Sequence, residues 1–206
     1  MSIKRKAAGI LAAALLAGFL LTGCSGTGAL NEKQIAALNE ITAGQAVPGR
    51  MGKISVPRET ASKFPALKKV FQADIDGECF YVFETESLGY RSRINLLVVI
   101  DPKKDEVSGI KVLEQDETPV YGGDYLEKDW FAERFQGKKT DGYLVRTILE
   151  AENDNEIIQI TGASVSSQAV VNGVNAAIGA YRELILGETA EPVELKVQGY
   201  ITGGSH

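Results

Sequence analysis

The chain has 206 residues, of which 44% are hydrophobic and 24% charged. That length suits one ordinary domain with a sizeable core, and the composition excludes a disordered chain and a polytopic membrane protein. The net charge of −5 argues against a general nucleic-acid binder, and the single histidine, His206, is terminal, so histidine-based triads and multi-histidine metal sites are disfavoured.

Residues 1–23 have the pattern of a bacterial lipoprotein signal peptide. Three basic residues at positions 4–6 precede an apolar run at 7–21, which is short for a membrane-spanning helix. The sequence Leu-Thr-Gly-Cys then ends at Cys24 and resembles a lipobox, in which the cysteine is acylated after cleavage. We therefore expect an extracytoplasmic protein with a lipid anchor on Cys24. An uncleaved N-terminal anchor helix is the alternative, and it exports the same part of the chain.

The exported part is expected to hold one domain between two extensions. Residues 24–60 contain a Gly- and Ser-rich tether over Ser25 to Leu30, a helix over Asn31 to Glu40 and a loop over Thr42 to Glu59. A short helix over Ala61 to Phe71 is expected to open near Pro65, because proline suits a first helical turn. The main domain then covers residues 61–187, and residues 188–206 form a C-terminal tail.

Short runs rich in β-branched and aromatic residues predict strands between turns. Three of them predict an antiparallel meander: Cys79 to Glu84, Ile94 to Asp101 and Val107 to Leu113. Further strand candidates are Tyr143 to Leu149, Glu156 to Ile160 and an edge strand over Val193 to Val197.

Two helices are predicted in the second half of the chain. Asp124 to Phe135 carries apolar side chains at helical spacing, with Asp124 able to cap the start and Gly137 following the end. Ser166 to Leu186 has the clearest amphipathic pattern of the chain, and Gly187 ends it. The expected fold class is therefore α+β, a single domain with a small, mainly antiparallel sheet packed by a few helices.

A cluster of hydroxyl groups lies at the start of the long helix, in the run Thr161-Gly162-Ala163-Ser164-Val165-Ser166-Ser167. The first N–H groups of a helix lack partners, the helix dipole adds partial positive charge, and small residues let a phosphate approach the backbone. The run therefore predicts an anion site. An ordinary helix N-cap is the alternative, because serine and threonine are common there, although no Glu or Gln completes a capping box.

The same run resembles the flavinylation motif of the FMN-binding domain found in the G subunit of Rnf electron-transport complexes and in the C subunit of the sodium-pumping NADH:quinone oxidoreductase. The family pattern is Ser/Thr-Gly-Ala-Ser/Thr-x-Ser/Thr, and residues 161–166 comply at every position. The resemblance implies that a flavin transferase, using FAD, esterifies the last hydroxyl to the phosphate of FMN. The acceptor is then Ser166, and the cofactor-binding residues around it are Thr161, Gly162, Ala163, Ser164, Val165 and Ser167.

A second stretch, Glu117-Thr118-Pro119-Val120-Tyr121-Gly122, stands where that family has Glu-Thr-Pro-Gly-Leu-Gly. The resemblance implies a loop beside the isoalloxazine ring, with Glu117 in the cofactor site. Thr118 then hydrogen-bonds to the flavin, and Tyr121 lies against the ring. Val120 replaces a family glycine, and Ile158 stands where the family often has an acidic residue. For this stretch alone an ordinary Pro/Gly turn is the alternative.

The sequence thus predicts a membrane-anchored electron-transfer flavoprotein with covalent FMN as its cofactor. The expected partners are a flavin transferase and membrane redox proteins, with no nucleic acid, no metal and no catalytic residue of its own. We expect an electron carrier or an oxidoreductase subunit, not a stand-alone catalyst. Two alternatives stay open, a G-type subunit of an Rnf ion-translocating complex and a non-redox lipoprotein binding module. A serine hydrolase is a distant alternative, because no histidine is available to activate Ser166 or Ser167.

Aromatic residues near these motifs have two possible roles. Tyr90, Tyr125 and Trp130 either line the flavin ring or belong to the core, and an aromatic side chain on a helix is more often core.

Overall fold

The computed structural model describes residues 29–44 and 46–197. The strands are β1 (Ala46–Ile54), β2 (Leu67–Ile75), β3 (Glu78–Leu88), β4 (Arg93–Asp101), β5 (Glu106–Glu114), β6 (Val145–Thr147) and β7 (Glu156–Ile158). The helices are α1 (Glu32–Thr42), α2 (Arg58–Lys63), α3 (Gly122–Tyr125), α4 (Asp129–Ala132) and α5 (Ser164–Tyr181), with a 3-10 turn η1 (Glu133–Phe135) and a π-helical turn η2 (Arg182–Leu186). Strands β1 to β5 form one antiparallel sheet in chain order, which confirms the predicted α+β class.

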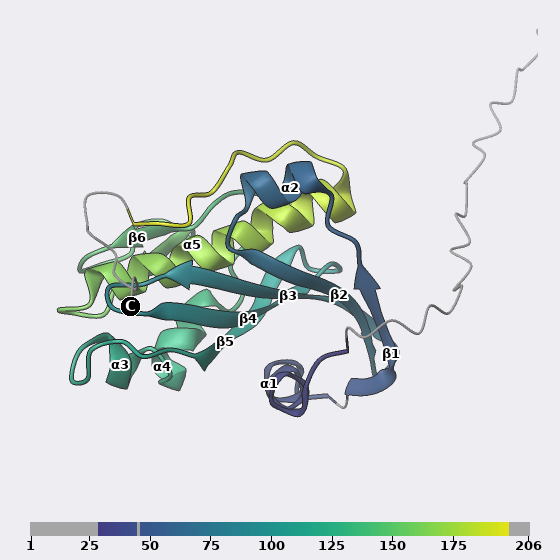
Figure 1. Cartoon of the computed structure of the whole chain (residues 1–206), viewed down its shortest axis with the longest axis horizontal. Coiled ribbons are helices and arrows are strands. Elements are labelled where there is room, and N and C mark those ends of the chain that lie inside the picture. Colours follow the sequence, from purple (N-terminus) through teal and green to yellow (C-terminus); the bar gives the residue numbers. More distant parts are fainter. Residues whose placement is uncertain (1–28, 45, 198–206) are drawn as a thin grey trace, which may run out of the picture.

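Helices cover both faces of the five-stranded sheet, with α5 on one face and α1 on the other (Figure 1). In β4, Leu96 and Val98 are fully buried in the core beneath α5, whereas Leu97 and Val99 are fully buried in a second core beneath α1. Successive side chains of a strand point to opposite faces, so a strand covered on both sides has no polar alternation. This explains the continuous apolar run that identified β4 in the sequence.

Helix α1 confirms the helix predicted after the tether. The Asn31 side chain accepts a hydrogen bond from the Gln34 N–H at 2.9 Å, and the Gln34 side chain accepts one from the Asn31 N–H at 2.9 Å, which makes a capping box. Leu38 is fully buried in the second core, and Leu30 is buried there as well. The tether prediction was therefore wrong at Leu30, because this side chain packs against the sheet.

Two elements near the start of the sheet differ from the prediction. The segment over Thr42 to Glu59 is not all loop, because it contains β1, an edge strand whose register shifts between Ala46 and Met51. Edge strands tolerate proline, glycine and bulges. Because β1 contains these features, its sequence lacks the alternation of apolar and polar residues that would have predicted a strand.

The helix expected over Ala61 to Phe71 is α2 followed by β2. Phe64 has φ −122°, outside the helical region, and a residue before a proline is disfavoured there.

The predicted helix over Asp124 to Phe135 is divided into α3, α4 and η1. Lys128, with ψ 137°, is extended and separates α3 from α4, and the Asp124 carboxylate accepts a hydrogen bond from the Val120 N–H at 2.8 Å. Strands β6 and β7 are shorter than predicted and form a separate parallel pair. Val193 to Val197 is not a strand, although the Val193 N–H donates to the Lys63 carbonyl at 3.0 Å.

Helix α5 confirms the long helix, and it lies very close to the sheet. A Cβ atom at Gly173 would lie 2.8 Å from Cδ1 of Leu96 in β4, and one at Gly179 would lie 2.4 Å from Cε1 of the buried Phe64. Glycine at these two positions therefore lets the helix lie closer to its neighbours than a larger side chain would permit. The N-terminus of α5 is thereby fixed beside the loop that follows β5.

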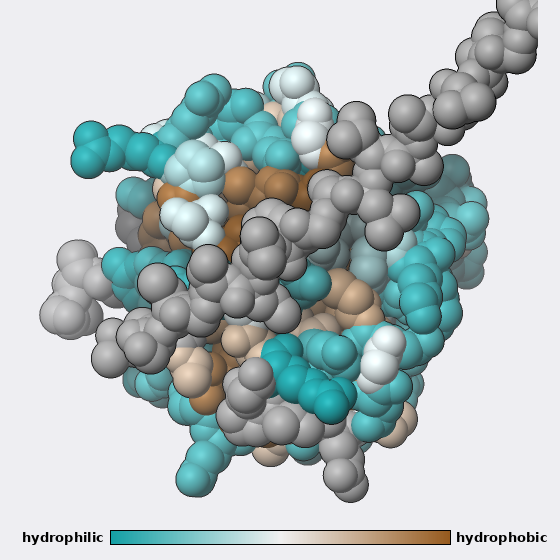
Figure 2. Space-filling view, turned by 90° about the vertical axis from the view of Figure 1, so that its right-hand side faces the viewer, coloured by the Kyte–Doolittle hydropathy of each residue, from teal (hydrophilic) through white to brown (hydrophobic). Residues whose placement is uncertain are grey.

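The predicted signal peptide and Cys24 lie outside the described residues. Among the residues that are described, none of the helices combines the length and apolar character needed to cross a membrane. Figure 2 shows the end of the molecule that carries β1, where polar side chains cover much of the surface and apolar ones show in recesses between them.

Candidate functional site

A cavity of about 400 Å³ lies at the N-terminus of α5. Two segments that are distant in the sequence line it, the loop after β5 and the turn between β7 and α5, together with Tyr90 from the β3–β4 connection. The lining residues are Tyr90, Glu117, Thr118, Tyr121, Gly122, Gly162, Ala163, Ser164, Val165 and Ser166. The fold therefore brings the two stretches that carried the family resemblance into one site.

Eight of the ten residues predicted to bind the cofactor line this cavity, and Thr161 and Ser167 do not. Thr161 is exposed. Ser167 is fully buried, and its hydroxyl accepts a hydrogen bond from the Ile160 N–H at 3.0 Å. Because that bond satisfies the backbone at the end of β7, Ser167 has a structural role in the connection.

Glu117 is the centre of the polar contacts in the cavity wall, and only 3% of its surface is exposed. One carboxylate oxygen accepts from the Arg91 N–H at 3.0 Å, the Ser92 N–H at 2.7 Å and the Ser92 hydroxyl at 3.1 Å. The other accepts from the Tyr90 N–H at 3.0 Å and from the Ser166 hydroxyl at 2.5 Å. A buried carboxylate is tolerated when donors surround it, so the backbone of residues 90–92 is arranged around this side chain.

Ser166 is also 3% exposed, and its hydroxyl lies between Glu117 and the backbone of Gly122. A Cβ atom at Gly122 would lie 2.7 Å from Ser166 Oγ, and a Cβ atom at Gly89 would lie 2.5 Å from Glu117 Oε1. Both positions therefore need glycine for steric reasons. These two contacts were missed in the sequence, since nothing in the spacing of the glycines shows which side chain each one faces.

No side chain caps the N-terminus of α5. The N-cap residue is Ala163, and the first turn has no acidic residue. Gly162, with φ +80°, makes the turn into the helix, a conformation that glycine adopts without strain. The ordinary N-cap interpretation of the hydroxyl run is therefore wrong for this helix, since the capping position is alanine. An uncapped helix N-terminus on a cavity fits the phosphate of FMN, because its N–H groups and dipole favour an anion.

Two half-exposed tyrosine rings line the mouth of the cavity. Tyr90 is 56% exposed and Tyr121 is 53% exposed, and Tyr121 lies against Gly162, where a Cβ atom would be 3.0 Å from the ring. Such rings can cover the face of a planar heterocycle. Trp130 and Tyr125 do not line the cavity, and their rings contact each other with centroids 6.3 Å apart.

Val120 has φ +68°, in the left-handed region that β-branched residues avoid. It stands in the position of the family glycine, so the loop keeps this conformation although the side chain opposes it. The Val120 side chain is 68% exposed and adds little packing energy to offset the strain.

Replacing Val120 with glycine is expected to stabilise the protein by about 1 kcal/mol, the strain relieved less the added flexibility of the unfolded chain. A rise in the urea midpoint at unchanged slope measures this. Val145→Gly is the matched control, because Val145 is also an exposed valine but lies in strand β6. That change is expected to destabilise the protein, and equal shifts for both variants would contradict the strain argument.

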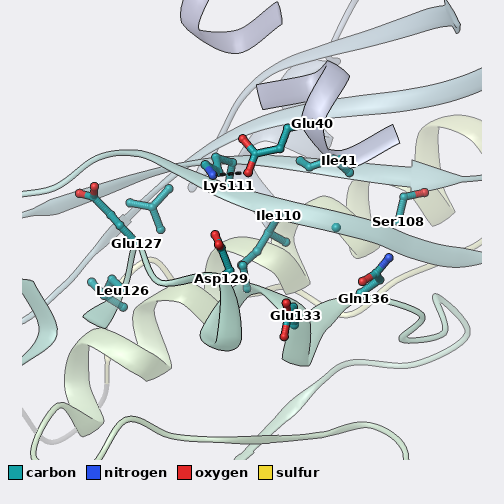
Figure 3. Close-up of a pocket in the computed structure, with 13 residues that line it drawn as sticks. Glu40, Ile41, Ser108, Ile110, Lys111, Leu126, Glu127, Asp129, Glu133 and Gln136 are labelled. Atoms are coloured by element: carbon teal, nitrogen blue, oxygen red, sulfur yellow. Dashed lines mark hydrogen bonds and ion pairs between the residues drawn. The ribbon is translucent and has the colours of Figure 1, made fainter. Parts of the chain in front are cut away.

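A second hollow of about 220 Å³ lies between α1, β5 and the α4–η1 segment (Figure 3). Lys111 forms an ion pair with Glu40 at 2.6 Å, and the lining also carries Glu127, Asp129 and Glu133. None of the residues predicted to bind a cofactor lines this hollow. The side chains of Glu127, Asp129 and Glu133 are exposed. We therefore take the cavity at the N-terminus of α5 as the candidate functional site.

The fold and the cavity define a small α+β protein with a cavity at an uncapped helix N-terminus, beside the loop that carries Tyr121. Residues 89–179 match the FMN-binding domain family. The matched range includes the loop after β5, the 161–167 run and most of α5.

Two relatives belong to oxidoreductase complexes. The chain is 36% identical over 98 residues to the G subunit of the proton-translocating ferredoxin:NAD(+) oxidoreductase complex of Clostridium ljungdahlii, covering 48% of this chain and 51% of that protein. It thus spans about half the length of that relative. It is 25% identical over 187 residues to the G subunit of the Na(+)-translocating ferredoxin:NAD(+) oxidoreductase complex of Acetobacterium woodii, covering 85% of this chain and 88% of that protein.

Solved structures show the same fold. The C subunit of the Na(+)-translocating NADH-quinone reductase of Parabacteroides distasonis superposes with a TM-score of 0.57 at 17% identity, covering 74% of this chain and 91% of that one. NqrC of Shewanella oneidensis gives a TM-score of 0.51 at 20% identity, covering 68% and 70%.

Proposed function

We propose that the protein is an electron-transfer flavoprotein that carries FMN covalently through a phosphoester to Ser166. The observation that supports this most directly is the placement of the Ser166 hydroxyl. It lines a cavity at the uncapped N-terminus of an 18-residue helix, and it is already hydrogen-bonded to a buried carboxylate. A phosphate bound by the N–H groups of that helix turn lies next to the hydroxyl that would receive it.

The remaining cavity residues fit the other parts of FMN. The first turn of α5, with Gly162, Ala163, Ser164 and Val165, holds the phosphate in this proposal, while Thr118 and Tyr121 contact the ring. The flavin supplies the one- and two-electron chemistry, and the protein supplies binding, orientation and electrostatics. A covalent bond suits an electron carrier outside the cytoplasm, because a dissociated cofactor would be lost by dilution.

The proposal includes maturation and a place at the membrane. A flavin transferase attaches the cofactor, and a lipid on Cys24 holds the exported protein beside membrane redox partners. Residues 1–23 are the signal peptide, 24–60 the N-terminal segment, 61–187 the FMN-binding domain and 188–206 the tail. Removal of three basic residues with the signal peptide leaves a more acidic protein, which suits a molecule held near an anionic membrane without lying flat on it.

Co-expression of the full chain with a flavin transferase tests the proposal. We expect flavin absorbance to stay with the polypeptide after denaturation and the intact mass to increase by one FMN less water. Flavin that separates on denaturation would indicate a non-covalent site. A colourless, unmodified chain would contradict the proposal and favour the non-redox binding module.

A second candidate function is that of a G-type subunit working inside an ion-translocating oxidoreductase complex. The similarity to the G subunit from Acetobacterium woodii over 85% of this chain favours it. Purification of the chain from its native host with integral-membrane redox subunits bound to it would support this function. Recovery of the flavinylated chain alone would favour a free carrier.

A further inference from the structure

The Ser166 hydroxyl has a built-in proton acceptor. Its oxygen lies 2.5 Å from a carboxylate oxygen of Glu117, and both side chains are 3% exposed. We propose that Glu117 takes the Ser166 proton when that oxygen forms the phosphoester. This inference rests on the proposed function, since it assigns a catalytic residue to the attachment of the cofactor.

Glu117 is held in place by bonds that do not involve Ser166. Three backbone N–H groups of residues 90–92 and the Ser92 hydroxyl fix the carboxylate. The oxygen that faces Ser166 also accepts the Tyr90 N–H. The carboxylate is thus oriented before any cofactor arrives, which lowers the cost of orienting it during the reaction.

Glu117 is better placed to accept the Ser166 proton than the other charged groups near the cavity. It is the one carboxylate among the described residues that line the cavity, and the other ionisable lining residues are Tyr90 and Tyr121. Arg91 and Asp116 pair with each other at 3.1 Å on exposed surface, and the nearby Asp124 carboxylate accepts a backbone N–H of the loop after β5. The first turn of α5 has no acidic side chain. A single O–H donor serves one acceptor well, and the Ser166 hydroxyl donates to Glu117.

The reaction balances with FAD as the co-reactant. Ser166 Oγ attacks the phosphorus on the riboflavin side of the FAD diphosphate, and a new O–P bond forms. The bridging P–O bond breaks, and AMP leaves with its electron pair. The hydroxyl proton moves to Glu117 and then returns to solvent. Because the O–H points at Glu117, the lone pairs of Oγ stay available for the phosphorus.

The test uses the purified full chain with a flavin transferase, FAD and Mg²⁺, and it follows initial rates of adduct formation by intact mass. Glu117→Gln is expected to lower the rate by about 100-fold or more, the usual contribution of a positioned base. Asp116→Asn is the matched control, because it makes the same carboxylate-to-amide change at the neighbouring residue, whose side chain pairs with Arg91 on exposed surface and does not line the cavity. It is expected to stay near the wild-type rate.

Rescue by the conservative variant separates the proton acceptor from a purely structural role. Glu117→Asp keeps a carboxylate and is expected to recover part of the rate that Glu117→Gln loses, whereas a side chain that only holds the backbone of residues 90–92 would give no such recovery. If Glu117→Gln loses its fold by circular dichroism, Glu117→Asp replaces it as the test. It keeps a carboxylate that is one methylene shorter, so a slower rate in the folded chain supports the proposal and an unchanged rate contradicts it.

Two failures are distinguishable. Wild-type chain that takes up no flavin contradicts the proposed function itself. Wild-type and Glu117→Gln chains that are modified at equal rates leave the function standing and overturn the role of Glu117, since the transferase then takes the proton.

Discussion

Replacement of Ser166 by alanine is expected to abolish covalent attachment of flavin. The variant removes the one hydroxyl of the 161–167 run that lies both on the cavity and within 2.5 Å of Glu117. Without that oxygen no phosphoester forms, so the loss should be complete and not partial. Intact mass and flavin fluorescence of the denatured chain, after co-expression with a flavin transferase, measure the result.

The neighbouring serines serve as matched controls. Ser164→Ala keeps the acceptor and should still be modified, because Ser164 lines the cavity and the hydroxyl bonded to Glu117 is that of Ser166. Ser167→Ala should also be modified, but it should lose about 1 kcal/mol of stability, because the Ile160 N–H loses its buried partner. Adduct on Ser166→Ala, or its loss on Ser164→Ala alone, would show that the acceptor has been assigned to the wrong residue.

Replacement of Phe131 by alanine is expected to cost about 3–5 kcal/mol of stability. Phe131 is fully buried and meets the ring of Phe135 edge-on with centroids 5.5 Å apart. The change leaves a cavity in the core that also contains the buried residues of α5. Because this core is closely packed, the neighbouring side chains cannot move far enough to fill the cavity. Thermal or urea unfolding of the full chain gives the difference in free energy.

Trp130→Ala is the control for this prediction, because it removes an even larger aromatic side chain next to Phe131. Trp130 is 42% exposed and contacts the Arg134 guanidinium at 4.6 Å from its ring centroid. Its loss is expected to cost about 1 kcal/mol, mainly this contact and partial packing. Similar losses for both variants would contradict the division into a core ring and a surface ring.

That division was not available from the sequence. Leu126, Trp130 and Phe131 share helical spacing, and spacing alone places all three on one face. The extended backbone at Lys128 breaks the helix and separates their directions, so that Leu126 and Phe131 are buried while Trp130 reaches solvent. The break depends on how α3, α4 and η1 pack against the rest of the fold, which local periodicity does not record.

The sequence alone determined the elements whose signal is local. β4 is visible because an apolar run between turns needs cover on both faces, and α1 because Ile35, Leu38 and Ile41 recur at helical spacing. The hydroxyl run before α5 was found in the same way, as was its resemblance to a family. These features depend on residues within one turn or one strand of each other, and propensity and hydrogen bonding act at that range.

Only the tertiary structure decided the rest. Strand β1 exists because β2 offers an edge to pair with, although its own sequence has no strand period. Glu117 and Ser166 are 49 residues apart, and the sheet and α5 bring their oxygens to 2.5 Å. The sequence carries both side chains, but their contact follows from long-range packing, in which Gly89, Gly122 and Gly173 permit the close approach of backbone and side chains.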